Sequence, residues 1–120
     1  MHTKKGGWFV KFGHAFRGLF LGIRGQSSFL VHLPTAILVV VASILLQVTA
    51  VELAILLLCI AGVLVAELFN SSIEHLARAV TREENPMVGA CLDIASGAVL
   101  VASLFASFVG LWIFLPRVFI

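Results

Sequence analysis

The stretch Leu53-Ala-Ile-Leu-Leu-Leu-Cys-Ile-Ala-Gly-Val-Leu-Val-Ala-Glu67-Leu-Phe-Asn70-Ser71-Ser-Ile-Glu74 begins as a purely apolar run and ends in polar groups. As a helix, the run to Phe69 is long enough to cross a hydrocarbon core of about 30 Å. An ionised carboxylate in hydrocarbon costs roughly 2.5 to 3.5 kcal/mol, so carboxylates inside spans usually face a protein interior, a water pocket or a ligand. The sequence therefore predicts a spanning helix whose polar end carries the functional site.

The composition of the whole chain is that of an integral membrane protein. Hydrophobic residues make up 61% of the 120 residues, charged residues make up 12%, and the mean hydropathy is +1.13. Soluble domains are about 45 to 50% apolar and about 25% charged, so the soluble globular class is excluded.

Apolar segments separated by polar breaks predict an all-α membrane fold with a single domain, residues 1–120. We expect an amphipathic surface helix at 8–25, where aromatic residues recur at three- and four-residue spacings between basic ones. Three transmembrane helices should follow, at 31–50, at 53–80 with a cytoplasmic extension, and at 87–115. Pro34 suits the first turn of the first span, and the hydrophilic residues 81–86 form the loop before the third.

Basic residues are concentrated before the first span, with no acidic residue among them: Lys4, Lys5, Lys11, Arg17 and Arg24. Loops rich in Lys and Arg stay on the cytoplasmic side, so the pattern predicts a cytoplasmic amino terminus. Three crossings then place the loop at 81–86 inside and Arg117 outside.

Five polar residues share one stripe of the second spanning helix. Successive residues of a helix are about 100° apart, so five polar side chains fall within one face of this helix: Glu67, Asn70, Ser71, Glu74 and Arg78. Glu67 and Glu74 lie two turns apart, about 10 Å along the axis. The deeper carboxylate is therefore a candidate base, and the shallower one a candidate ligand for a divalent cation.

The third span offers a surface that could face this stripe. It carries Gly89, Asp93, Ser96 and Gly97, in which small residues permit close helix approach and Asp93 adds an ionisable group. Oxygen ligands of this kind suit Mg²⁺, which keeps several waters and is shared with substrate phosphates. Hydrogen bonding between helices is the simpler interpretation of Asn70 or Ser71 alone. Packing at the membrane interface is likewise the simpler interpretation of His14, His32 and His75.

Several strings resemble the prokaryotic diacylglycerol kinase and undecaprenol kinase family across about residues 8–117. They are His14-Ala-Phe-Arg17-Gly18, Glu67-Leu-Phe-Asn70-Ser71-Ser-Ile-Glu74-His75, Asp93-Ile-Ala-Ser-Gly-Ala-Val and Ile113-Phe-Leu-Pro-Arg117. The His after Glu74 and the Phe-Leu-Pro ending are closer to the undecaprenol kinase branch. The resemblance implies a homotrimer in the bacterial inner membrane that transfers the γ-phosphate of MgATP to a lipid alcohol, either undecaprenol or diacylglycerol.

The same resemblance implies roles for individual residues. Glu67 matches the proposed general base, and Glu74 a metal-binding glutamate. Asn70 matches a phosphate or metal contact, and Asp93 an acid of the nucleotide site. Ser71, Arg78 and Arg17 complete the candidate nucleotide and phosphate contacts, and Gln26 stands where the family usually has a second metal-binding Glu.

Three positions depart from the family pattern and leave alternatives open. Besides Gln26, Arg78 stands where the family usually has Asp, and Leu92 where it has Lys. One hypothesis is that the phosphate-binding cation has moved from the third span to Arg78. The alternatives are a catalytically impaired member that binds lipid or nucleotide, with Arg78 paired to Glu74, and a small transporter or channel subunit.

Overall fold

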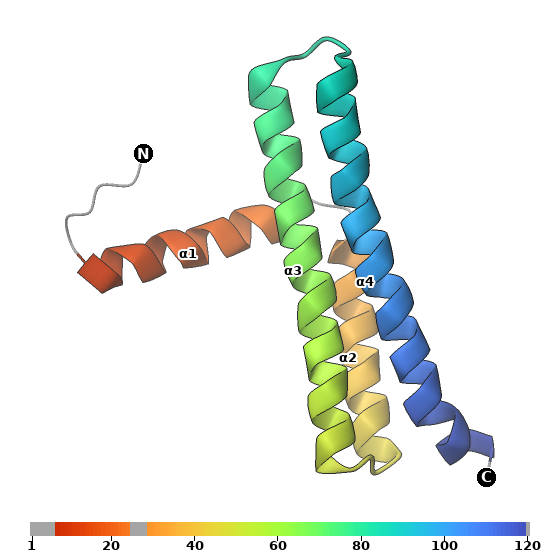
Figure 1. Cartoon of the computed structure of the whole chain (residues 1–120). Helices are drawn as coiled ribbons and strands as arrows, with labels where there is room; N and C mark the ends of the chain where they lie inside the picture. The colour runs from red at the N-terminus through yellow and green to blue at the C-terminus, as the bar shows by residue number, and fades with distance from the viewer. Residues whose placement is uncertain (1–6, 25–28, 120) are drawn as a thin grey trace.

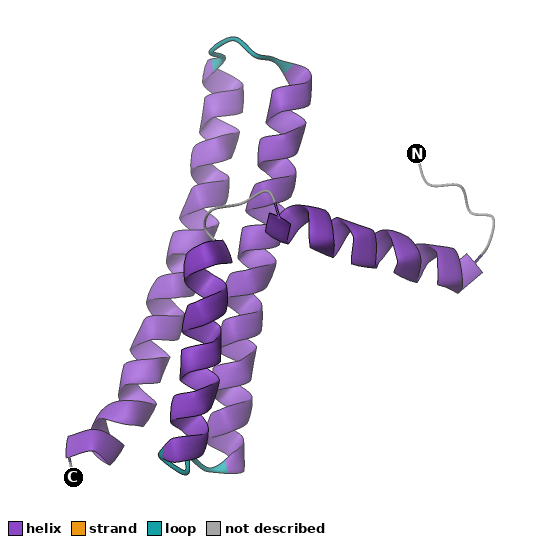
Figure 2. Ribbon diagram, turned by 180° about the vertical axis from the view of Figure 1, so that it is seen from behind, coloured by secondary structure: helices purple, strands orange, loops and turns teal. Residues whose placement is uncertain are grey.

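The computed structural model describes residues 7–24 and 29–119. These residues form four α-helices, α1 (Gly7–Arg24), α2 (Phe29–Leu45), α3 (Ala50–Val80) and α4 (Pro86–Phe119). α3 and α4 form a long antiparallel pair, and α2 lies against the half of that pair farther from the 81–85 loop (Figure 1). Seen from behind, α2 stands in front of the pair and α1 projects sideways (Figure 2).

The expected all-helical membrane class is confirmed at the level of the helices. Of the described helices, α3 and α4 are long and apolar enough to cross a membrane, and a third span results if α1 and α2, which are bent by 104°, are counted together. α2 alone has 17 residues. That length is at the lower limit for a transmembrane helix.

The contact between α1 and α3 fixes the height of α1 along the bundle. A Cβ added at Gly22 would lie 2.7 Å from Cδ2 of Leu68, so the two helices approach closely there. From the start of α3 at Ala50, Leu68 is 18 residues along, or about 27 Å of helix. This matches a hydrocarbon core of about 30 Å. The α3–α4 hairpin continues beyond α1, away from the α2 turn (Figure 1).

The turn between α2 and α3 lies earlier than predicted. α2 ends at Leu45, short of residue 50, and α3 begins at Ala50, ahead of residue 53. Gln47 adopts a positive φ of 53°. Thr49 caps α3, because its hydroxyl accepts from the Glu52 N–H at 3.1 Å while Glu52 Oε1 accepts from the Thr49 N–H at 2.9 Å. The sequence predicts a short turn here but misplaces it by a few residues, because apolar residues flank it on both sides.

The other helix ends also differ from the predicted bounds. α2 begins at Phe29, so Pro34 lies in its interior and not in its first turn. Pro34 has no N–H to donate to the carbonyl at Leu30, and the neighbouring turns hold the helix there. α1 begins and ends one residue before the predicted 8–25, and α4 continues four residues past 115, to Phe119.

Burial in the single chain runs opposite to that of a soluble protein. Glu67 (2% exposed) and Ser71 (1% exposed) are among the most buried described side chains, and Asn70 is also buried. Large apolar side chains cover the outer faces of all four helices. An apolar exterior around a polar interior is the arrangement that a hydrocarbon solvent favours.

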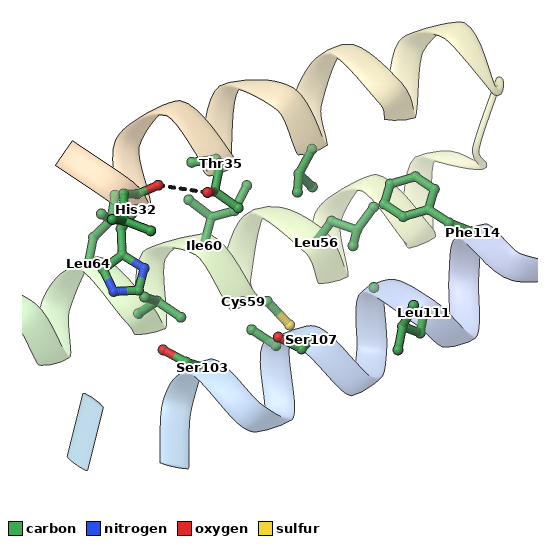
Figure 3. Close-up of a pocket in the computed structure, with 16 residues that line it drawn as sticks. His32, Thr35, Leu56, Cys59, Ile60, Leu64, Ser103, Ser107, Leu111 and Phe114 are labelled. Atoms are coloured by element: carbon green, nitrogen blue, oxygen red, sulfur yellow. Dashed lines mark hydrogen bonds between the residues drawn. The ribbon is translucent and has the colours of Figure 1, made fainter. Parts of the chain in front are cut away.

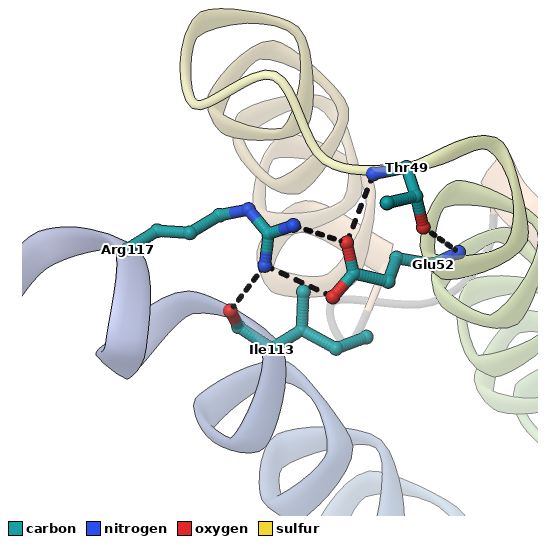
Figure 4. Close-up of polar contacts among 4 residues, drawn as sticks. All are labelled: Thr49, Glu52, Ile113 and Arg117. Carbon is teal, nitrogen blue, oxygen red and sulfur yellow. Dashed lines mark hydrogen bonds and ion pairs between the residues drawn. The ribbon is translucent and has the colours of Figure 1, made fainter.

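An ion pair joins the start of α3 to the end of α4, at the end of the bundle that carries the turn between α2 and α3 (Figure 4). Arg117 near the end of α4 donates to both carboxylate oxygens of Glu52, at 2.9 Å and 2.5 Å, and to the carbonyl of Ile113 at 3.2 Å. The pairing is bidentate, which is the strongest geometry for Arg and carboxylate. The lone basic residue at this end is therefore paired with an acid from the neighbouring helix.

We expect Arg117→Ala and Glu52→Gln each to lower the Tm of the protein in detergent. Each removes the same contact between α3 and α4. A double-mutant cycle measures the coupling: the double variant should lose little more than the more damaging single variant. Fully additive losses would contradict a stabilising Glu52–Arg117 contact.

Candidate functional site

One face of α3 changes its chemistry in three steps along the helix. Leu56 and Val63 are buried and apolar, Glu67, Asn70 and Ser71 are buried and polar, and Glu74 is partly exposed. These positions share one side because they recur at three- and four-residue spacings. The predicted stripe therefore runs continuously from the membrane interior into the hairpin beyond α1.

Glu67 is the most deeply placed ionisable group on this face. Its Oε1 lies 3.1 Å from Nε2 of His32 on α2, which is within range of an ion pair. Within the described residues its Oε2 has no hydrogen-bond partner. A buried carboxylate with one oxygen unengaged carries a desolvation cost that a substrate donor would offset. Glu67 is thus placed to accept a hydrogen bond or a proton.

Asn70 lies between Glu67 and Glu74 along the helix and contacts Glu74. Its Nδ2 donates to Oε1 of Glu74 at 2.6 Å. The side-chain oxygens of Asn70 and Ser71 are buried, and neither has a partner among the described residues. One turn further on, His75 is exposed, and its Nδ1 lies 2.8 Å from the Ser71 carbonyl. Glu67, Asn70 and Ser71 thus form a buried polar centre, in which each side chain has an oxygen atom without a hydrogen-bond partner among the described residues.

A polar groove with a volume of about 830 Å³ adjoins the centre on the hairpin side. It runs between the end of α3, the loop at 81–85 and the start of α4. Charged groups from α3 and the loop line it: Glu74, Arg78, Arg82, Glu83 and Glu84. A groove of this size, with cations and carboxylates together, suits a phosphorylated ligand carrying a divalent cation.

An apolar cavity of about 500 Å³ adjoins the centre on the opposite side. It lies among α2, α3 and α4, with His32 at one end and Phe114 at the other (Figure 3). The cavity and the polar groove together flank the buried group of Glu67, Asn70 and Ser71 along α3. The carboxylate of Glu67 thus lies along α3 between an apolar compartment and a polar one.

Two predicted contacts do not join this arrangement in the single chain. Asp93 is exposed and is not among the residues lining the groove, whereas Gly89, Leu92 and Ser96 line it. Adjacent helix residues are about 100° apart, so the phase that turns Leu92 toward α3 turns Asp93 aside. Arg17 on α1 is also exposed and lines neither compartment. The expected meeting of Asp93 with the glutamate stripe is therefore absent from the described fold.

Arg78 and Leu92 both line the polar groove, one from α3 and one from α4. Arg78 is exposed and brings a positive charge to the groove, whereas Leu92 on the opposite helix brings none. This position fits Arg78 as a phosphate-binding cation that enters the groove from α3.

The donor set for a metal ion is small. Among residues 7–24 and 29–119, no group of three His, Cys, Asp or Glu side chains could hold one. Glu74 and Asn70 supply two neighbouring oxygen ligands. Mg²⁺ is often bound by one or two carboxylates plus waters and substrate phosphates, so these residues fit a metal that arrives with a nucleotide. Gln26, the other predicted ligand, lies outside the described residues.

His32 belongs to the centre, although interface packing is the simpler interpretation of it from sequence. In the structure it contacts Glu67 and lines the apolar cavity. Its distance of 35 positions from Glu67 in sequence hides this pairing. One feature of the sequence could have indicated the pairing. His32 lies near the start of the first span, and in an antiparallel pair of helices that position is level with the later part of the second span, where Glu67 lies.

Comparison with known proteins shows similarity to lipid kinases. Residues 13–114 match the family described as prokaryotic diacylglycerol kinase. The chain is 34% identical to an undecaprenol kinase of Bacillus subtilis over 110 residues, which cover 92% of this chain and 89% of that protein. It is also 32% identical to a diacylglycerol kinase of Synechocystis over 108 residues, which cover 89% of this chain and 62% of that protein.

Proposed function

This chain belongs to the prokaryotic diacylglycerol kinase family, and we propose that it transfers the γ-phosphate of ATP to the hydroxyl of a membrane lipid alcohol. The family resemblance of the sequence is thereby confirmed, and the family is one of ATP-dependent lipid kinases. One observation carries the proposal: Glu67 is buried between an apolar cavity in the membrane part and a polar groove beyond it. A lipid alcohol and a nucleotide would approach that carboxylate from opposite sides.

Glu67 acts as the general base. A lipid hydroxyl loses its proton as its oxygen attacks phosphorus, and a base within hydrogen-bond reach assists that step. The unengaged Oε2 of Glu67 provides the acceptor. His32 holds the other oxygen and so orients the carboxylate.

The polar groove holds the nucleotide phosphates. Glu74 and the Asn70 amide oxygen would hold Mg²⁺, which when bound neutralises charge on the transferred phosphoryl group. Arg78 binds phosphate oxygens from α3, and the Ser71 hydroxyl donates to one of them. Asp93, Arg17 and Gln26 are assigned as further contacts to the nucleotide or metal, in keeping with the family pattern.

The amino terminus and the polar groove face the cytoplasm, where ATP is available. The basic residues before α2 favour this orientation in a bacterial inner membrane. On the outer side, Arg117 is a single basic residue, paired with Glu52, against five basic residues before α2. The functional unit is proposed to be a homotrimer, and the exposed apolar faces of α3 and α4 leave surface for both lipid and partner chains.

The test is a phosphorylation assay on purified protein with MgATP and a panel containing undecaprenol and diacylglycerol. Phosphorylated lipid from either alcohol supports the proposal, and the ratio of the two rates identifies the preferred class. The uncharged Leu92 in the groove motivates the competing function, a non-catalytic lipid or nucleotide binder. ATP binding without transfer to any alcohol would establish that function and overturn the kinase.

We expect His32→Phe to lower kcat about tenfold while the KM for MgATP stays within about twofold. The substitution keeps a ring in the cavity wall but removes the nitrogen that orients Glu67. His75→Phe is the matched control, because His75 is exposed and contacts only the helix backbone of Ser71 among the described residues. Equal kcat values for wild type and His32→Phe would contradict an orienting role.

A further inference from the structure

One side of α1 is a continuous aromatic face that the rest of the described chain leaves uncovered. α1 has no buried residue, and it approaches α3 near its own end, at Gly22. At about 100° per residue, six exposed apolar side chains fall within an arc of about 120°: Trp8, Phe9, Phe12, Phe16, Leu19 and Phe20. Gly22 lies outside this arc, so the contact with α3 leaves the aromatic face open.

Each edge of the aromatic face carries a cation that rests on a ring. Nζ of Lys11 lies 5.0 Å from the ring centroid of Trp8, and Cζ of Arg24 lies 5.8 Å from that of Phe20. Both distances are within the cation–π range. Trp8 and Phe20 stand at the two limits of the arc, and the cations lie about 60° and about 40° beyond them. Positive charge therefore borders the aromatic face on both sides.

These two cations have no acidic partner within residues 7–24 and 29–119. The ion pairs of the structure involve neither Lys11 nor Arg24. The first acidic residue of the chain is Glu52, so α1 carries no carboxylate of its own. A ligand that satisfies the whole surface must then bring an anion and hydrocarbon together.

The height of α1 decides between a lipid and a protein as that ligand. Gly22 meets Leu68, which lies about 27 Å along α3 from its start at Ala50. That level is the boundary of a hydrocarbon core of about 30 Å. α1 projects sideways from the bundle at this level (Figure 1). Acyl chains and headgroup phosphates meet at the same boundary, so a phospholipid offers both chemistries where α1 lies.

We propose that α1 binds anionic phospholipids selectively, with its aromatic face among acyl chains and with Lys11 and Arg24 on the headgroups. A helix lying at the membrane interface does not by itself distinguish lipids, whereas the two bordering cations do. Each Lys or Arg near an anionic membrane surface favours binding by about fivefold. The rings hold these cations in place, which lowers the entropy lost when a headgroup binds.

The experiment uses the two tryptophans of the chain, Trp8 and Trp112. Full-length Trp112→Phe protein, in which Trp8 is the sole fluorophore of this kind, is reconstituted in vesicles of phosphatidylcholine and phosphatidylglycerol. Only one of the two lipids carries brominated acyl chains, so quenching of Trp8 reports which lipid lies beside it. Brominated phosphatidylglycerol should quench several-fold more than phosphatidylcholine at equal mole fraction, and high salt should reduce the difference. Equal quenching by both lipids, or no quenching, would overturn the proposal.

Charge variants of α1 identify the groups that select the lipid. Lys11→Gln and Arg24→Gln should each lower the ratio of phosphatidylglycerol to phosphatidylcholine binding by up to about fivefold. Lys11→Arg and Arg24→Lys keep the charge and should keep the ratio. Arg17, assigned above to the nucleotide, stays unchanged throughout. A preference that survives both glutamine substitutions together would refute the roles of Lys11 and Arg24.

Trp8→Phe provides the matched control, because it leaves Trp112 as the reporter on α4. The basic residue nearest in sequence to Trp112 is Arg117, which is already paired with Glu52. Both lipids should therefore quench Trp112 equally, and a preference at both tryptophans would show a general enrichment that α1 does not cause. Neither ATP nor a lipid alcohol is present, so this result stands or fails separately from the kinase activity.

Discussion

Replacing Glu67 by glutamine should lower kcat for lipid phosphorylation by about 10²- to 10⁴-fold, the usual contribution of a general base. The substitution keeps the size of the side chain and its ability to accept from His32. It removes the capacity to take a proton from the lipid hydroxyl. The KM for MgATP should change little, because the nucleotide phosphates lie on the other side, in the polar groove.

A second substitution at the same position sharpens this test. Glu67→Asp retains a carboxylate but withdraws it by one CH₂ group, so its kcat should lie between those of wild type and Glu67→Gln. Oligomer size and Tm in detergent must match the wild type in both variants. Turnover by Glu67→Gln equal to that of the wild type would eliminate Glu67 as the base.

The sequence was sufficient to predict the helical membrane class and the polar stripe. A long apolar run specifies a spanning helix, and the 100° step between residues places Glu67, Asn70 and Ser71 on one face without further information. Their burial in the structure follows because a bilayer excludes polar groups from the outer surface. These features depend on local periodicity alone.

Features that depend on the relation between helices could not be predicted in the same way. Which of Leu92 and Asp93 faces α3 is set by the rotation of α4 about its axis, which its nearly uniform apolar sequence does not specify. The contact of His32 with Glu67, and that of Arg117 with Glu52, depend on relative helix heights. The apolar cavity likewise arises from small residues on one helix opposite two others.

Replacing Arg78 by alanine should lower kcat/KM for MgATP by about 10- to 100-fold. Hydrogen bonds to charged groups contribute about 1.5 to 3 kcal/mol, and Arg78 is the cation that α3 supplies to the polar groove. The variant Arg78→Ala/Leu92→Lys should regain most of this loss. Its new cation enters the same groove from α4, at the position where the family usually has Lys.

The rescue distinguishes a relocated charge from a general effect of added charge. Leu76→Lys combined with Arg78→Ala adds the same cation near the same level, but Leu76 is exposed and does not line the groove. That variant should remain impaired. Because Arg78 and Leu92 face one compartment from two helices, recovery only in the Leu92→Lys background would mean that the groove requires a cation but not a particular helix to carry it. Activity of Arg78→Ala equal to wild type would show instead that Arg78 has no part in phosphate binding.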